Sequence, residues 1–179
     1  AIRSRGLGDV YKRQQLWLGT EEKGIYLYSP KYPRSLLHLN QSTLTFNGPV
    51  RKIVELDSSY LLVSRSGIFE LDIYNQSDST TFNITPISKE IRYRDAVLDT
   101  ANNVVWIGSR DGLYRYKDGQ IELQGGINTG IVARIQTLAL DQDGTLWMGT
   151  EDGLLHQRED VLIKYGTEEG LSNTLINNL

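Results

Sequence analysis

The stretch that decides the fold is Leu146 to Leu154, LWMGTEDGL. It combines an aromatic residue, a glycine, a small hydroxyl residue and a second glycine that opens another apolar run. The same pattern occurs three more times upstream, as LWLGTEEKGI (16–25), YLLVSRSGI (60–68) and VWIGSRDGL (105–113). This repeat, rather than any single catalytic-looking residue, is the main feature of the sequence.

The repeat predicts the fold class. Its aromatic position recurs with a period of about 41 to 45 residues, and each unit holds four short runs of β-branched, aromatic and leucine residues bounded by turn formers. Such a period built from strands favours propeller blades over helical repeats. We predict an all-β fold, a β-propeller of about four blades of four antiparallel strands, as a fragment of a larger propeller. The predicted units lie near 15–39, 50–84, 94–123 and 134–165, with a further unit starting at 174–179.

The register of the repeat assigns strands A to D, from the propeller axis outward. The expected A strands are Val50–Leu56, Asp95–Leu98 and Ile135–Leu140, with Leu175–Leu179 opening another. The expected B strands are Leu16–Gly19, Tyr60–Ser64, Val104–Ser109 and Leu146–Thr150. The expected C strands are Gly24–Tyr28, Gly67–Asp72, Gly112–Tyr116 and Gly153–Gln157. The expected D strands, at the outer edge, are Ser35–Leu39, Thr80–Ile84, Gln120–Leu123 and Val161–Tyr165.

Two positions of the repeat have a structural interpretation. A glycine inside strand B weakens the strand, so we expect it where a neighbouring backbone or side chain approaches closely. A tryptophan two residues earlier supplies about 150 to 250 Å² of apolar area for packing between blades. These structural positions are Trp17, Gly19, Trp106, Gly108, Trp147 and Gly149; the second unit has Leu61 and Val63 instead.

Bulk composition excludes several classes of function. The 179 residues carry 19 Lys and Arg against 22 Asp and Glu, so a net charge of -3 makes nucleic acid an unlikely partner. No apolar run approaches the roughly 18 residues of a membrane-spanning helix, so we expect no membrane contact by this segment. The absence of cysteine excludes disulfides without choosing a compartment. Residues 1–14 show neither strand nor helix periodicity and are interpreted as a non-propeller tail, artefactual or disordered.

Catalytic and metal signatures are weak. His38 and His156 fall in different units without metal-ligand spacing, and Asp141-x-Asp-Gly lacks the later ligands of a calcium loop. The sequence has no nucleophile elbow and no phosphate-binding glycine pattern. We therefore expect no metal, no cofactor and no catalysis in this chain.

The units resemble the two-component regulator propeller repeat, whose consensus joins an apolar strand and Asp-x-x-Gly to Leu-Trp-x-Gly-Thr-x-x-Gly-Leu. Residues 135–154 match it almost throughout, and 104–113 match its second half. Residues 165–179, YGTEEGLSNTLINNL, are similar to its inter-blade link. The second unit departs from the pattern at Leu61 and Val63.

The resemblance implies a ligand-sensing segment in the periplasmic part of a membrane-anchored bacterial hybrid two-component receptor. It implies an oligosaccharide-type or other small-molecule signal, with neighbouring blades or sensor domains as partners and a homodimer as a possible state of the full receptor. The alternatives are a propeller enzyme, such as a lyase or glycosidase, and a passive protein-interaction platform. A closed four-bladed ring, with residues 175–179 completing the first unit, is a further alternative to a fragment of a longer array.

Strand order indicates where a ligand would bind. The D-to-A links and B-to-C turns should share one face, and variable loops on a rigid scaffold commonly carry function. Tyr93, flanked by two arginines, is expected to stack on a sugar. The alternative interpretation is that these residues are solvated or form salt bridges between blades. The candidate ligand-binding residues are Arg65, Arg92, Tyr93, Arg94, Arg110, Arg134 and Glu151.

Overall fold

The computed structural model describes residues 16–20, 25–28, 36–39, 49–65, 67–75, 80–89, 92–124, 134–158 and 161–179. Within these residues all regular structure is β-strand, so none of them forms a helix that would cross a membrane. The predicted tail at 1–14 lies outside the described residues.

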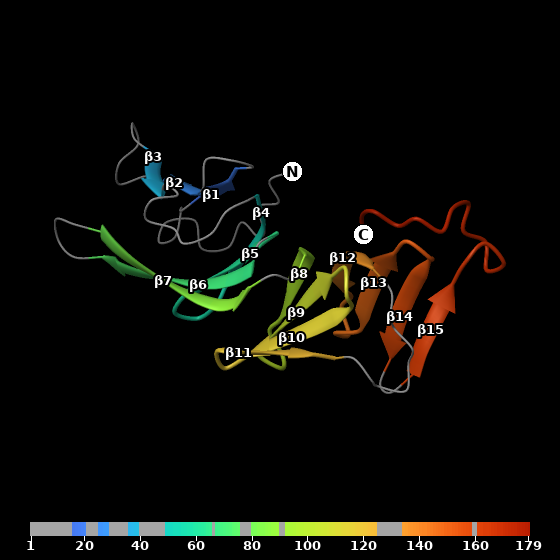
Figure 1. Ribbon diagram of the computed structural model, residues 1–179. Coiled ribbons are helices and arrows are strands. Elements are labelled where there is room, and N and C mark those ends of the chain that lie inside the picture. The colour runs from blue at the N-terminus through green and yellow to red at the C-terminus, as the bar shows by residue number, and fades with distance from the viewer. Residues whose placement is uncertain are drawn as a thin grey trace.

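Four antiparallel sheets follow one another along the chain and fan out as an open arc (Figure 1). We number them as blades 1 to 4. Blade 1 has three described strands, β1 (Leu16–Gly19), β2 (Ile25–Tyr28) and β3 (Leu36–Leu39). Blade 2 consists of β4 (Val50–Glu55), β5 (Tyr60–Ser64), β6 (Gly67–Asn75) and β7 (Thr80–Lys89). Blade 3 consists of β8 (Tyr93–Asp99), β9 (Val104–Ser109), β10 (Leu113–Lys117) and β11 (Gln120–Leu123). Blade 4 consists of β12 (Ile135–Leu140), β13 (Leu146–Thr150), β14 (Leu154–Arg158) and β15 (Val161–Tyr165).

The predicted all-β architecture of antiparallel blades is confirmed. Each described sheet keeps its strands in chain order, so A is followed in space by B, C and D. The four predicted B strands coincide with β1, β5, β9 and β13 at both ends.

The hairpin of β6 and β7 is longer than predicted. Its pairing extends from Asn75 opposite Thr80 to Gly67 opposite Lys89, with one register shift. Pro86 lies within β7 although proline has no N–H to donate to a ladder. It is tolerated since β7 is the outer strand of blade 2, and a register shift beside Phe69 takes up the extra residue.

The prediction of a strand at Leu175–Leu179 is wrong. Residues 175–179 form no β-ladder with any described strand. Instead, the Ile176 N–H donates a hydrogen bond of 2.9 Å to the Thr150 carbonyl of blade 4. The segment does not join the sheet of β1, so the described blades form an arc and not the alternative closed ring (Figure 1).

Among the described residues, the hydrophobic core consists of three layers, one between each pair of neighbouring blades. The layer between blades 1 and 2 includes Ile25 and Leu62, and the layer between blades 2 and 3 includes Leu61 and Ile107. The layer between blades 3 and 4 includes Leu113, which packs with residues of β12 and β13. Stability therefore depends on contacts between neighbouring units, as in other repeat proteins.

The strand-B glycines lie where the next part of the chain approaches closely. A Cβ built on Gly19 would lie 3.0 Å from the Cβ of Val50, and one on Gly108 would lie 2.5 Å from the Cγ2 of Ile135. A Cβ on Gly149 would lie 2.7 Å from the Cγ2 of Ile176. The predicted reason for these glycines is confirmed.

The tryptophans of the repeat do not all pack alike. Trp17 lies 4.9 Å from the ring of Tyr60 in the next blade, and Trp106 packs into the layer between blades 3 and 4. Trp147 instead stacks within its own blade on His156, with ring centroids 3.8 Å apart. Packing between blades is confirmed for the first two, whereas Trp147 lies on a face of blade 4 that no described blade covers.

Candidate functional site

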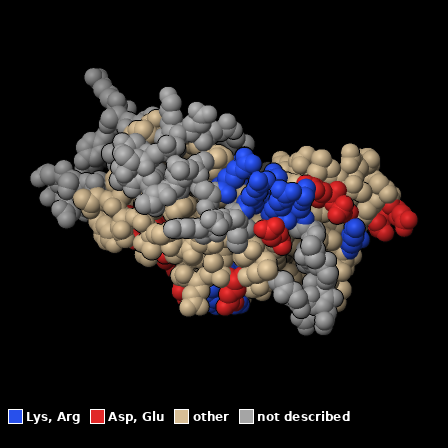
Figure 2. All heavy atoms as spheres, viewed as in Figure 1, with Lys and Arg blue, Asp and Glu red and all other residues tan. Residues whose placement is uncertain are grey.

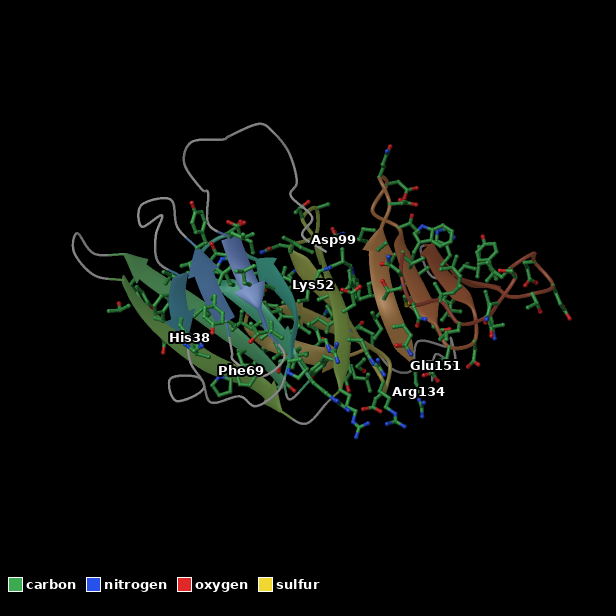
Figure 3. All side chains as sticks on the ribbon, turned by 90° about the horizontal axis from the view of Figure 1, so that it is seen from above. His38, Lys52, Phe69, Asp99, Arg134 and Glu151 are labelled. Carbon is green, nitrogen blue, oxygen red and sulfur yellow. The ribbon has the colours of Figure 1, made fainter. Side chains whose placement is uncertain are left out.

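The B-to-C turns and the starts of the A strands lie side by side at one edge of the blades. The Arg110 N–H donates to the Arg92 carbonyl at 3.2 Å, and the Arg65 N–H donates to the Pro49 carbonyl at 3.3 Å. We call this edge the linker face; its described residues are 49–51, 65, 92–94, 110–111, 134–136 and 151–152. Figure 3 shows Arg134 and Glu151 together at this edge and Asp99 at the opposite edge.

A hydroxyl residue closes each described B-to-C turn. The Ser109 Oγ donates to the Gly112 carbonyl at 2.9 Å, and the Thr150 Oγ1 donates to the Gly153 carbonyl at 2.7 Å. Gly112 and Gly153 have φ values of +133° and +126°, which favour glycine. In blades 3 and 4 the hydroxyl and the glycine thus shape the turn, and the side chains of the two residues between them reach solvent.

The corner of blade 4 is internally paired. The Glu151 carboxylate accepts a hydrogen bond of 3.1 Å from the Gln136 Nε2 and lies 3.2 Å from the Arg134 Nη1. The Arg134 and Glu151 side chains are 46% and 39% exposed, so the ion pair contributes only about 0 to 1 kcal/mol to stability. These two predicted site residues are brought together, but they already satisfy each other.

The corners of blades 2 and 3 have a different chemistry. In blade 4, Gln136 occupies the register shift of strand A, and Glu151 follows strand B. The same two positions are Arg51 and Arg65 in blade 2. They are Arg94 and Arg110 in blade 3, with Arg92 adjoining. All five arginines are exposed, and within the described residues no carboxylate forms an ion pair with them.

We call these five residues the arginine corners: Arg51, Arg65, Arg92, Arg94 and Arg110. Figure 2 shows Lys and Arg side chains gathered into one group in the middle of the viewed face, beside a group of Asp and Glu. Sequence reasoning named four of the five. Arg51 was missed, although its place one residue into strand A matches that of Arg94 and could have identified it.

The expectation that Tyr93 stacks on a sugar is wrong. Its side chain is 1% exposed, and its ring packs edge-on against Tyr114 at 5.6 Å in the layer between blades 2 and 3. Its hydroxyl forms a hydrogen bond of 2.9 Å with the Ser88 Oγ, and burial raises the pKa of Tyr93 to about 12. Neighbouring residues of a strand point to opposite faces, so the exposure of Arg92 and Arg94 goes with the burial of Tyr93.

A polar chain behind the arginine corners was also missed. The Lys52 Nζ lies 3.2 Å from the Asp95 Oδ1, which links the inner strands of blades 2 and 3. The Asp95 Oδ2 accepts hydrogen bonds from the Thr137 Oγ1 at 3.1 Å and the Leu138 N–H at 2.9 Å, which links blades 3 and 4. One carboxylate therefore ties three blades together and fixes the spacing of their corners.

The other candidate groups have structural surroundings. His38 stacks on Tyr26 with ring centroids 4.3 Å apart, and His156 stacks on Trp147. In the part of the chain that the structure describes, no three His, Asp or Glu side chains gather closely enough to hold a metal ion. Glu21 and Glu22, and the links at 40–48 and 125–133, lie outside the described residues.

Comparison with known proteins agrees with the repeat. Residues 129–152 match the family described as two component regulator propeller. This segment contains β12, the following turn, β13 and the acidic corner residues of blade 4. Residues 129–152 are therefore similar to one repeat of this family. No curated protein matches the chain.

Several solved structures share its fold. One is the extracellular domain of a B. thetaiotaomicron protein described as the hybrid two component system BT4673, with a TM-score of 0.71 and 24% identity over 92% of this chain. Another is that of BT3049 from the same organism, with a TM-score of 0.67 and 21% identity over 94%. PorZ, a type-IX secretion system component of Porphyromonas gingivalis, has a TM-score of 0.65 and 14% identity over 92%. The chain spans 23%, 22% and 28% of the length of these three chains.

Proposed function

We propose that this chain, in which residues 129–152 are similar to a two component regulator propeller repeat, is part of the ligand-sensing propeller of a bacterial hybrid two-component receptor. Its ligand would be an oligosaccharide-type signal bound at the linker face, on the outer side of the cytoplasmic membrane. The family match and the fold shared with extracellular domains of hybrid two-component systems support the sensor role. The shared fold alone does not decide it, because the secretion component PorZ has a similar propeller.

The observation that carries the proposal is the contrast between scaffold and corners. Turn-closing hydroxyls recur in blades 2, 3 and 4 and strand-B glycines in blades 1, 3 and 4, whereas the residues that the described turns present to solvent differ in charge. A constant scaffold with varied exposed corners is the arrangement expected of a binding face. The segment is proposed to bind without catalysis, because the Glu151 carboxylate of the linker face is already held by Arg134 and Gln136.

Signalling would occur if the ligand bound one arrangement of the receptor more tightly than another. A ligand that binds both arrangements equally shifts nothing, however tightly it binds. Moving an equilibrium from 1:99 to 99:1 requires a preference of about 10⁴-fold. The rigid ties between inner strands through Asp95 suit this role, since they would transmit displacement of one corner to the neighbouring blades.

Titration calorimetry with a panel of oligosaccharides tests the proposal. The panel pairs neutral tetrasaccharides, such as xylotetraose, cellotetraose and mannotetraose, with the acidic tetragalacturonate. Saturable binding of at least one saccharide, with one site per chain, is expected. Absence of binding across the panel by a chain with an intact β-sheet circular dichroism spectrum would count against the proposal. Turnover of a saccharide, lost when one carboxylate is replaced, would favour the enzyme alternative.

A further inference from the structure

The three described corners have the same backbone geometry and different chemistry. Val50 lies opposite Ser64 in blade 2, Tyr93 opposite Ser109 in blade 3 and Ile135 opposite Thr150 in blade 4, each followed by a register shift in strand A. The strand-A residue at the register shift and the residue that follows strand B therefore lie at the same corner of their blade. In blade 4 the two side chains are hydrogen-bonded at 3.1 Å as Gln136 and Glu151.

At the same two positions, blades 2 and 3 each carry two arginines. In blade 4 the side chains at these two positions are close enough to form a hydrogen bond. Two positive charges at the equivalent positions repel one another. The nearest inner-strand carboxylate, Asp95, does not relieve this repulsion, because its oxygens are engaged by Lys52, Thr137 and the backbone of β12. Asp111 lies at the corner of blade 3 but forms no ion pair within the described residues. The corners are thus a positively charged surface in a chain of net charge -3.

We infer that the arginine corners bind the anionic group of an acidic oligosaccharide, either the carboxylate of a uronic acid or a sulfate ester. This inference rests on the proposed saccharide-sensing function and specifies the class of ligand. Guanidinium groups present N–H donors in a planar fork that matches the paired oxygens of a carboxylate or sulfate. A single anionic group between Arg94 and Arg110 would replace their repulsion by two charge-assisted hydrogen bonds.

The surroundings favour a short acidic saccharide over a long polyanion. Asp111, Glu151 and Asp152 belong to the B-to-C turns of the linker face, as Arg110 does, and would repel the successive phosphates of a nucleic acid. The corners are also held in place, since the Lys52 and Asp95 ion pair joins the strands that carry Arg51 and Arg94. An anionic group would therefore meet donors that need little reorganisation.

The chain itself supplies the design of the test variant. Replacing Arg94 by Gln and Arg110 by Glu gives blade 3 the pair that blade 4 already accommodates, so the variant should fold. The matched control, Lys117→Glu with Lys164→Gln, makes the same change in net charge at exposed positions outside the arginine corners, at the C-to-D turn of blade 3 and in the outer strand of blade 4. The wild type, the Arg94→Gln/Arg110→Glu variant and the control variant must have near-identical circular dichroism spectra and thermal midpoints.

Titration calorimetry then uses two matched ligand pairs. One is tetragalacturonate and its methyl ester, which has the same sugar rings without the charges. The other is a sulfated carrageenan tetrasaccharide and its desulfated form. We expect one charged ligand to bind at least about tenfold more tightly than its uncharged partner, and the Arg94→Gln/Arg110→Glu variant to lose about tenfold or more in affinity for it. The control variant should bind as the wild type does.

The outcomes separate the two proposals. Equal binding of charged and uncharged partners would overturn the anionic assignment and leave saccharide sensing intact. Selective binding of a charged ligand that Arg94→Gln/Arg110→Glu does not weaken would overturn the assignment to these residues. If the control variant lost as much affinity for the charged saccharide as the test variant, general charge attraction would explain the effect and the inference would be overturned. Binding of poly-glutamate as tight as that of the charged saccharide would have the same consequence. Failure of every saccharide, charged or neutral, would overturn both proposals.

Discussion

The contact between Gly108 and Ile135 offers a direct test of how neighbouring blades pack. A Cβ added at Gly108 would lie 2.5 Å from the Ile135 Cγ2 and 3.1 Å from its Cβ, and Ile135 is buried in the layer between blades 3 and 4. Gly108 has no positive φ, so the substitution Gly108→Ala creates no backbone strain. Its whole unfavourable effect must come from the clash.

The magnitude follows from two opposing terms. Overpacking a buried contact costs about 1 to 3 kcal/mol, whereas replacing glycine by alanine at a compatible φ recovers about 0.4 to 1 kcal/mol from the unfolded state. The free energy of unfolding should therefore fall by up to about 2.6 kcal/mol, and by about 1.3 kcal/mol at the middle of both ranges. Removing the clashing methyl with Ile135→Ala should cancel this loss, so Gly108→Ala should be neutral or slightly stabilising in that background.

Urea unfolding followed by tryptophan fluorescence measures both changes. Gly166→Ala is the control, because its Cβ would meet only a Glu169 carboxylate oxygen at 3.4 Å, and it should change stability by less than about 0.5 kcal/mol. Equal destabilisation by Gly108→Ala in the wild type and the Ile135→Ala background would refute the proposed contact. Stabilisation of the wild type by Gly108→Ala would refute it as well.

Three further expectations concern stability. Trp106→Ala should lower the free energy of unfolding by about 3 kcal/mol. The loss for Trp147→Ala should be smaller by at least about 1 kcal/mol, because Trp147 stacks within its own blade. Asp95→Ala should cost about 1 to 3 kcal/mol in urea unfolding by leaving the Leu138 N–H without its acceptor, whereas Glu168→Ala in an exposed turn should cost under about 0.5. Burial raises the pKa of Tyr116 from 10.0 to about 12. The neutral Tyr116 phenol should therefore contribute to the free energy of unfolding below pH 10, and this contribution should be lost as the pH rises through 12. Tyr116→Phe should weaken that alkaline loss in thermal melts; an unchanged pH dependence would contradict it.

Much of the scaffold could be predicted because the motif occurs four times. Aligning the copies placed strand B of every blade, and the close approach at Gly108 followed from the cost of a glycine inside a strand. What the alignment could not supply was the contact between inner strands of different blades. Asp95 looks like an ordinary strand residue in its own unit, and only the placement of Lys52 and Thr137 beside it reveals its role.

In the candidate site, too, some features could be predicted from the sequence and others could not. The linker face followed from strand order, and all of its arginines except Arg51 were predicted from the turns and links. Tyr93 was misassigned because aromatic character was weighted above strand alternation, which places it inward between two exposed arginines. The pairing of Gln136 with Glu151 depends on a register shift in strand A, and irregularities of this kind leave no signal in a short strand.

Hydrogen exchange followed by mass spectrometry tests the central claim, that ligand binds at the linker face, most directly. The chain is compared with and without a saturating concentration of the oligosaccharide that binds in the titration panel. Amides at 92–94 and 110–112 should gain protection, whereas the turns at 100–103 and 117–119 at the opposite edge should exchange as before. Protection confined to those opposite turns, or no change at the linker face with ligand bound, would contradict the account.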